Sequence, residues 1–518
     1  MTTSHSNGAK SAGPEASFRK RYLFKLVTNL IGMGVGIGTQ AIVPRALGPA
    51  AYGDFSFLTS FFQQVVGFLN LNTSTAFYTK LSQRQKDRGI VNYYFYFTVI
   101  LGIALGLIVA VCFATDLRQS VWPGQSVVFI VFGAVWAYMT FGSMVLSDMS
   151  DAYGLTVRSE IVKMALKIFG FMLIVLLFWQ QWLTLLGFFI YHVIFLLATL
   201  VLLGWVVKGS GLRIADARLL PRKQVNDYTR EFASFCTPLV AFTAIAVFEG
   251  ILDRWFLQKF SGSVQQGFYG LAYQIGTLCF LFASAMIPLV AREYAIAFSK
   301  HDLGEMRRVF MRSTPMLYAI VAYFSCFIAA ESRNVMLLFG GEAYAGAVIP
   351  ITIMCFFPIH QTYGQLNASV FFATNRTIAY RDIGIFLVFI GLPLTFFLLG
   401  PKEYGALQAG ATGLAAKMVF IQFVSVNIQL WYNTRFMNLS FKYLLGHQLI
   451  VIASFSLAAL VCSFAVRTLL GHMHYGVQFF VSGLLYTIFV AGLGITFPSL
   501  FAVRREEITN FWTGWQRT

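Results

Sequence analysis

The feature that most constrains this chain is a series of long apolar runs separated by short polar segments. A helix needs about 20 residues to cross about 30 Å of hydrocarbon, and about fourteen runs approach that length. Their rough bounds are 22–44, 52–78, 92–115, 126–147, 159–179, 182–206, 232–258, 265–291, 313–330, 345–372, 380–399, 404–432, 443–466 and 476–499. The chain is 57% apolar and only 11% charged, which is more lipid-compatible surface than a soluble domain needs. The sequence therefore predicts an all-α polytopic membrane protein with about fourteen transmembrane helices.

The distribution of basic residues tests this count. Of the 38 Lys and Arg residues, 28 fall in the tails and even-numbered connections or at the run edges beside them, six in the odd-numbered connections and four deeper within runs. Cytoplasmic loops carry an excess of Lys and Arg, so both termini are expected in the cytoplasm. The same asymmetry accounts for the net charge of +17 without nucleic acid as a partner.

A polar elbow interrupts the first two apolar runs. The elbow is Val43–Phe57, VPRALGPAAYGDFSF, and it contains Gly48-Pro49. Proline lacks an N–H group and disfavours the α conformation of the residue before it, so this dipeptide should end one helix. The elbow is therefore predicted to be the tip of a transmembrane hairpin. A weaker echo lies in Asp253–Tyr273, where Tyr269-Gly270 repeats Tyr52-Gly53 in the second half of the chain.

A second pair of similar segments, Ala152–Glu160 and Ala373–Arg381, has nearly the same offset along the chain as the two Tyr-Gly pairs. Two such close offsets predict two six-helix lobes in the same orientation, a parallel repeat about an axis along the membrane normal. Such folds place a substrate cavity between the halves. The predicted division is a disordered cytoplasmic tail 1–21, an N-lobe 22–206, a basic cytoplasmic connector 207–231, a C-lobe 232–432, two appended helices 433–502 and a cytoplasmic tail 503–518.

Several chemistries lack their characteristic residues. The six cysteines all fall in apolar runs without CxxC spacing, so neither a disulfide framework nor a metal site is predicted. No GxxxxGK[ST] segment occurs, so the chain should not hydrolyse ATP. The predicted outer loops are short and hold no carboxylate pair, which disfavours a membrane glycosyltransferase, polymerase or ligase. We expect no enzymatic activity and no cofactor.

Three segments carry a resemblance to a known family. They are the elbow, LLFGGEAYAGA at Leu337–Ala347 and LNASVFFATNR at Leu366–Arg376. Together they resemble the polysaccharide-unit flippases, the O-antigen and exopolysaccharide translocases of the multidrug/oligosaccharidyl-lipid/polysaccharide (MOP) exporter superfamily. The resemblance implies two lobes forming a V, a central cationic cavity and alternating access.

The resemblance also implies a function. The expected cargo is an undecaprenyl-diphosphate-linked oligosaccharide, moved across the bacterial inner membrane for lipopolysaccharide or exopolysaccharide synthesis. Expected partners are this lipid-linked oligosaccharide, membrane lipids and the polysaccharide polymerase or chain-length machinery. The alternatives are a multidrug/cation antiporter of the same superfamily, a lipid II flippase and, from the enzyme class, a glycan polymerase.

Four cations are candidates for the substrate diphosphate. Lys163 and Lys167 lie one turn apart on one run, and Lys417 lies midway along another. Ionisable residues at bilayer depth normally face a cavity or a partner, and a snorkelling or ion-paired role stays open for each. Arg45, within the elbow, either guides an anionic headgroup or caps the carbonyls of the first helix.

Two carboxylates are candidates for ion coupling. Glu249 and Asp253 are one helical turn apart. Glu249 lies about 15 Å from Lys259 along a helix, near mid-membrane, so it is predicted either to couple transport to protons or to form an ion pair with Lys417. Asp253 and Arg254 are expected to be closer to the outer face and hydrated.

The second run is unusually polar for a membrane span. Its amides are Gln63, Gln64, Asn70 and Asn72. Amides that line a cavity can exchange hydrogen bonds with sugar hydroxyls, whereas interhelical bonding is the alternative. The density of polar groups favours a cavity lining.

Overall fold

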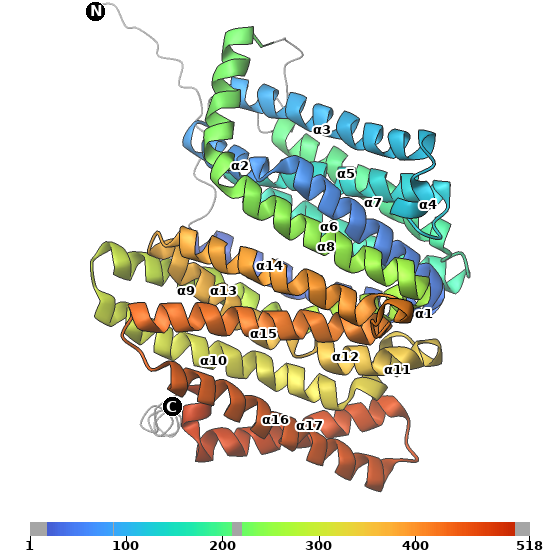
Figure 1. Ribbon diagram of the computed structural model, residues 1–518, viewed down its shortest axis with the longest axis vertical. Helices are drawn as coiled ribbons and strands as arrows, with labels where there is room; N and C mark the ends of the chain where they lie inside the picture. Colours follow the sequence, from blue (N-terminus) through green and yellow to red (C-terminus); the bar gives the residue numbers. More distant parts are fainter. Residues whose placement is uncertain (1–17, 86, 210–219, 503–518) are drawn as a thin grey trace, which may run out of the picture.

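The computed structural model describes residues 18–85, 87–209 and 220–502, and this part of the chain contains helices and no strands (Figure 1). Most of the predicted tail 1–21, all of the predicted tail 503–518 and the middle of the predicted connector lie outside the described residues. Ten described helices are long and apolar enough to cross a membrane, or eleven if the bent pair Thr243–Cys279 and Ala283–Ser299 is one span. The predicted fold class is confirmed.

The helices follow one another with short connections. The N-terminal half contains α1 (Phe18–Asn70), α2 (Thr73–Gln83), α3 (Arg88–Ala114), α4 (Arg118–Val121), α5 (Val127–Ala152), α6 (Thr156–Trp179) and α7 (Leu185–Gly209). The C-terminal half contains α8 (Arg222–Cys279), α9 (Leu281–Ser299), α10 (Leu303–Ala330), α11 (Ser332–Phe339), α12 (Val348–Met354), α13 (Phe357–Ala373), α14 (Thr377–Leu399) and α15 (Gly410–Phe436). The last two helices are α16 (Phe441–Leu470) and α17 (Tyr475–Thr496). Short 3-10 turns lie at Glu342–Ala347, Lys402–Tyr404 and Pro498–Phe501.

The buried side chains form three large cores. One gathers residues between Phe57 and Cys236, and another gathers residues between Ala283 and Leu500. The third joins the two halves, with residues between Val43 and Ala415. The second core includes Val451 of α16 and Tyr486 of α17, so the two last helices share the core of the C-terminal half. Figure 1 shows the halves as two stacked groups of helices, with α1 and α8 between them and α16 and α17 along the outer side.

Both α1 and α8 are hairpins rather than continuous helices. Gly48 has φ 72° and Gly262 has φ 78°, conformations that glycine adopts without strain. Across Gly48, the Tyr52 hydroxyl donates to Gln40 Oε1 at 3.2 Å, although twelve residues would span about 18 Å in a continuous helix. The chain therefore reverses at Gly48, where the elbow predicts a hairpin tip.

The two hairpins meet at their tips. A Cβ atom on Gly53 would lie 1.8 Å from the Ser263 carbonyl oxygen, and one on Gly267 would lie 2.0 Å from the Pro49 carbonyl oxygen. Glycine is thus required on both sides of the contact. Gly53 contacts Gly267. Gly48 and Gly262, the two glycines with positive φ at the hairpin tips, are separated by the same number of residues. The register predicted from the two Tyr-Gly pairs is therefore wrong at this point, by less than one helical turn.

The structure also tests the second pair of similar segments and the second predicted span. Gly154 and Asn375 both have positive φ, at the α5–α6 and α13–α14 turns. They are equivalent positions of the second pair of similar segments, so that part of the predicted repeat is confirmed. The second span is broken, because Leu71 and Asn72 have φ 45° and 63° between α1 and α2. We call the end of the bundle that holds Gly48 and Gly262 the elbow end, and the opposite end, where α7 ends at Gly209 and α8 begins at Arg222, the connector end.

Candidate functional site

A polar cavity of about 490 Å³ lies between the two halves. Its walls come from α1 after the elbow, from α5, from both arms of α8 and from α15. The lining residues are Phe55, Ser56, Thr59, Ser60, Gln63, Gln64, Trp136, Gly250, Asp253, Arg254, Tyr269, Tyr273, Gln274, Leu414 and Met418. Hydroxyls, amides and aromatic rings therefore make up most of its surface.

The cavity is closed toward the elbow end. Tyr52 and Tyr344 are buried and pack edge to face with ring centroids 6.4 Å apart, beside the contact between Gly53 and Gly267. In contrast Gln63, which lies farther toward the connector end on the same arm of α1, is exposed. A lining residue that is also exposed marks the mouth, so the cavity opens away from the elbows.

Arg254 supplies the positive charge of the cavity. Its guanidinium carbon lies 4.4 Å from the centroid of the Tyr269 ring, and Nη1 donates to Gln266 Oε1 at 3.1 Å and to Ser56 Oγ at 3.5 Å. Gln266 Nε2 donates back to the Arg254 carbonyl at 2.5 Å, which holds the two arms of α8 together. Both guanidinium hydrogen bonds to described residues use Nη1, so Nη2 keeps N–H groups for an anionic ligand.

A buried ion cluster stands behind this wall. Lys417 Nζ donates to Glu249 Oε1 at 2.6 Å and to Asp253 Oδ2 at 2.7 Å. Thr395 donates to Asp253 Oδ1 at 2.6 Å. The Lys417 side chain is 2% exposed, so the cluster joins α8, α14 and α15 around a buried ammonium. One ammonium faces two carboxylates, which gives the cluster a formal charge of −1.

The ion pair between Glu249 and Lys417, one of the two predicted alternatives, is thus present. Asp253 is only 6% exposed, against the expectation that it is hydrated, and Arg254 lies in the wall of the polar cavity rather than near the outer face. The sequence places Arg254 too near the helix end: its helix continues past Lys259 to Gly262, eight residues or about 12 Å beyond Arg254.

The predicted lysines of the N-terminal half lie elsewhere. Lys163 Nζ donates to Glu160 Oε1 at 2.5 Å and to Ser147 Oγ at 3.1 Å, so its charge is paired. Lys167 is exposed, and its ammonium lies beside Gly32 of α1, 3.0 Å from where a Cβ atom would stand. Neither lysine, nor Lys417 or Arg45, is among the lining residues of the described cavity.

Arg45 connects separate parts of the elbow end. It donates to the Leu337 carbonyl at the end of α11 and, at 3.2 Å, to the Tyr475 hydroxyl of α17. It therefore caps α11, whereas the cap that the sequence offers as one of two roles for Arg45 is on the first helix.

The polar residues of the second span serve two purposes. Gln63 and Gln64 line the cavity, as predicted. Asn70 instead closes the α1–α2 break, where its Oδ1 accepts hydrogen bonds from the Thr73 hydroxyl and the Ser74 amide. Asn72 donates to Thr243 of α8 at 2.7 Å. The two glutamines therefore lie in the cavity wall, whereas the two asparagines form hydrogen bonds at and beside the α1–α2 break.

Sequence reasoning also missed the aromatic wall, Trp136, Tyr269 and Tyr273. A tyrosine or tryptophan in an apolar span carries no signal of its own, because such residues are common there. Among the described residues no group of three or more His, Cys, Asp or Glu side chains is placed to hold a metal ion.

Comparison with solved structures identifies the fold. The lipid II flippase MurJ in an inward closed conformation aligns with a TM-score of 0.63 and 11% identity, over 92% of this chain and 99% of that one. A multidrug resistance MATE family transporter of the MOP superfamily, inward-facing, aligns with a TM-score of 0.59 and 13% identity, over 80% and 98%. A MOP superfamily transporter from Pyrococcus furiosus, described as having a binding pocket of reversed polarity, gives 0.55 and 13%, over 83% and 99%. No protein-family model and no curated protein matches the sequence. The chain thus has the multi-pass fold of MOP-superfamily transporters and flippases.

Proposed function

We propose that this protein is a flippase that moves an undecaprenyl-diphosphate-linked oligosaccharide across the bacterial inner membrane during surface polysaccharide synthesis. The observation that carries the proposal is the guanidinium of Arg254 in a cavity lined mostly by amides, hydroxyls and aromatic rings, where the carboxylate of Asp253 is already bound by Lys417 and Thr395. The fold, shared with transporters and a lipid II flippase, supports transport as the general activity.

The charges near the cavity favour an anionic cargo. Asp253 reaches the wall, but Lys417 and Thr395 bind its two oxygens. The positive charge of Arg254, in contrast, is met by neutral acceptors. Guanidinium groups bind phosphates through paired, charge-assisted hydrogen bonds, so a diphosphate is a suitable ligand.

The neutral lining suits sugars. Gln63, Gln64 and Gln274 offer amide donors and acceptors, and the Trp136 and Tyr273 rings offer flat apolar faces with polar edges. In the proposed cycle the diphosphate would bind Arg254, the sugars would bind these amides and rings, and the polyprenyl tail would stay in the bilayer. The connector end would be cytoplasmic, as the basic residues predict, so the described state would accept cargo from the cytoplasm and elbow separation would release it outside.

Other predicted site residues enter this proposal as secondary groups. Lys163, Lys167 and Arg45 would attract the headgroup along its path, and Glu249 and Asp253 would couple transport to an ion if their pairing with Lys417 opens. The proposed function also implies that the protein works with the polysaccharide polymerase and the chain-length machinery.

A multidrug/cation antiporter is the second candidate. The ion cluster favours it, since two carboxylates share one lysine and opening of the pairs would leave a net negative site. A lipid II flippase differs from our proposal in cargo rather than fold, and a glycan polymerase would act after translocation.

The test is binding and flipping by the purified full chain in proteoliposomes. A fluorescent undecaprenyl-diphosphate oligosaccharide should bind and cross, and Arg254→Gln should weaken binding about 10- to 100-fold, the value of a charge-assisted hydrogen bond. Arg333→Gln, which removes an exposed arginine of α11 outside the cavity, should leave binding unchanged. Equal binding by both variants would refute the role of Arg254.

Competition separates the candidates. A lipophilic cation that is transported while the oligosaccharide is not would establish the antiporter instead. Preferential transport of lipid II over the oligosaccharide would establish that the protein is a lipid II flippase. In the host, deletion should accumulate the lipid-linked oligosaccharide on the cytoplasmic side, whereas accumulation of single repeat units outside would indicate a polymerase.

A further inference from the structure

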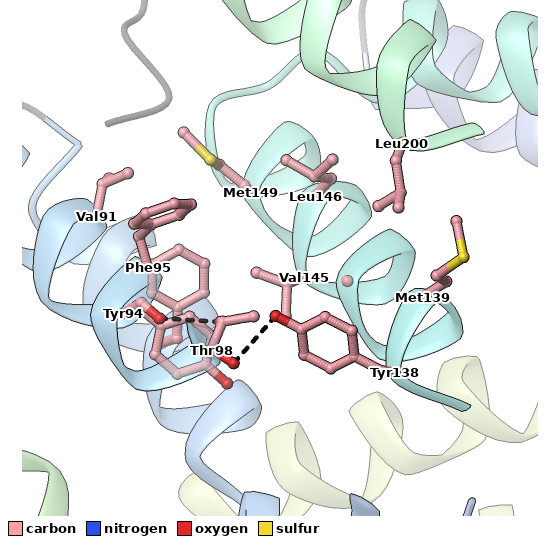
Figure 2. A pocket seen from close by; sticks show the side chains of 12 residues that line it. Val91, Tyr94, Phe95, Thr98, Tyr138, Met139, Val145, Leu146, Met149 and Leu200 are labelled. Atoms are coloured by element: carbon pink, nitrogen blue, oxygen red, sulfur yellow. Dashed lines mark hydrogen bonds between the residues drawn. The ribbon is translucent and has the colours of Figure 1, made fainter. Parts of the chain in front are cut away.

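A second cavity, of about 250 Å³, lies in the N-terminal half between α3 and α5, with Leu200 of α7 on one side. Figure 2 shows Val91 and Phe95 of α3 on one wall and Val145 and Leu146 of α5 on the other. The central polar cavity lies elsewhere: Trp136 of α5 lines that one, and residues from Tyr138 onward line this one.

The interior of the α3–α5 cavity accepts hydrocarbon rather than polar ligands. Its hydroxyls are already used: Tyr138 donates to the Thr98 carbonyl at 3.3 Å, and Thr98 donates to the Tyr94 carbonyl at 2.9 Å (Figure 2). At about 30 Å³ for each water-sized group, the cavity holds roughly eight such groups, and a methylene group is of similar size. That length corresponds to a substantial part of one acyl chain.

A free cation stands at the mouth of this cavity. Arg88 opens α3, and Val91, Phe95 and Thr98 follow it at helical spacing, so all four residues share one face. Val91 is three residues, about 4.5 Å, farther along the axis. Arg88 is exposed and has no hydrogen-bond or ion-pair partner among the described residues. It lies at the connector end, where the basic residues predict the cytoplasmic membrane surface.

Arg88 also faces the opposite wall. Burial raises the pKa of Tyr153, the residue that follows α5; the positive charge of Arg88 opposes this shift, and the negative charge of Asp87, which accepts a hydrogen bond from Tyr228, adds to it. The guanidinium therefore lies close to the ends of both helices that form the cavity. Its neighbour Arg84 differs, because it binds Glu231 of α8 at 2.5 Å.

We propose that the α3–α5 cavity binds one anionic phospholipid, with an acyl chain inside and the phosphate at Arg88. The charge at the mouth selects an anionic headgroup, and the apolar interior selects the chain. The polyprenyl tail of a transported lipid is a poorer occupant, because a diphosphate at Arg254 would bind on another face of α5. The bound lipid would fill the space between α3 and the helices it packs on.

Native mass spectrometry of the delipidated full chain tests this site. The probes are phosphatidylglycerol, phosphatidylcholine and undecaprenyl phosphate. Arg88→Gln should weaken phosphatidylglycerol binding about fivefold, the contribution of one basic residue at an anionic surface, and should leave phosphatidylcholine binding unchanged. Val145→Phe, which fills the cavity, should reduce retention of both phospholipids to that of non-specific adducts.

Two variants serve as matched controls. Arg292→Gln removes an exposed arginine of α9, and Val135→Phe enlarges an exposed valine of α5 outside the cavity. Both should bind lipid as the unmodified protein does. The proposal would be overturned if Arg88→Gln and Val145→Phe bound phosphatidylglycerol as the unmodified protein does. It would also be overturned if equimolar undecaprenyl phosphate displaced phosphatidylglycerol and Val145→Phe abolished this displacement.

Discussion

The ion cluster of Lys417, Glu249 and Asp253 gives the sharpest prediction for stability. Lys417→Met keeps a long unbranched side chain but removes the ammonium that meets both carboxylates, at 2.6 and 2.7 Å. Removal of one partner from a buried pair typically costs about 3–5 kcal/mol, because a charge is left buried without compensation. Two carboxylates lose their partner here, so we expect the free energy of unfolding to fall by at least about 3 kcal/mol.

The assay is reversible denaturant unfolding in mixed micelles, with Arg292→Met as the control. Arg292 and Glu293 form an exposed pair 3.5 Å apart, which should contribute less than about 1 kcal/mol. A combined variant, Lys417→Met with Glu249→Gln and Asp253→Asn, removes all three charges and should recover most of the loss, since uncharged replacements of buried pairs are often neutral.

Two results would refute this reasoning. If Lys417→Met loses no more stability than Arg292→Met, then water or another group compensates the charges of Glu249 and Asp253. If the combined variant is no more stable than Lys417→Met, the loss arises from packing rather than from uncompensated charge. The first result would also favour a cluster that opens to water during transport.

Further predictions concern the elbows, the connector end and the α1–α2 break. Gly53→Ala should disrupt the closed elbow end, since its Cβ would lie 1.8 Å from a carbonyl oxygen; cysteine crosslinking across the elbows would report it, and unchanged crosslinking would contradict it. Hydrogen bonds from Arg84, and then Lys80, lower the pKa of Glu231 below its usual 4.5. This group should therefore stabilise the fold above pH 4.5 and lose that contribution as the pH falls through its folded pKa, a dependence that Glu231→Gln should remove from unfolding curves. Asn72→Ala should cost about 1 kcal/mol by removing its hydrogen bond to Thr243, and no change in unfolding would show that water replaces it.

The features that depend on residues close together in the sequence, such as helix positions and the first elbow, are predicted correctly from the sequence. Apolar runs of membrane length identify the helices, and Gly48-Pro49 identifies the first elbow because proline ends helices locally. The pairing of Glu249 with Lys417 was also predictable, since both lie midway along spans of one half. The break at Leu71 and Asn72 could not be predicted in the same way. Both residues have positive φ, but only asparagine commonly adopts this conformation, and a single asparagine does not end a helix as proline does.

The rest depends on contacts between hairpin arms. Arg254 becomes a cavity residue only because α8 reverses at Gly262 and brings Gln266 and Tyr269 beside it. The repeated Tyr-Gly pair suggested that Gly53 corresponds to Gly270, whereas the glycine that it faces across the elbows is Gly267. Side-chain identity alone cannot choose between registers that differ by three positions, because residues at that spacing share a helix face.

The elbow contact and the ion cluster tie α8 to different halves of the protein. One arm is tied through Glu249 and Asp253 to α14 and α15, while the tip is locked against α1 at Gly267. Separation of the elbows needs no change in the cluster if α8 moves with the C-terminal half as a body, because all three helices of the cluster belong to that half. Arg254 would move with them, since its partner Gln266 is also in α8, and would lose only Ser56 of α1. The structure thus favours a motion in which the positive charge remains with the C-terminal half and the amides of α1 move away from it.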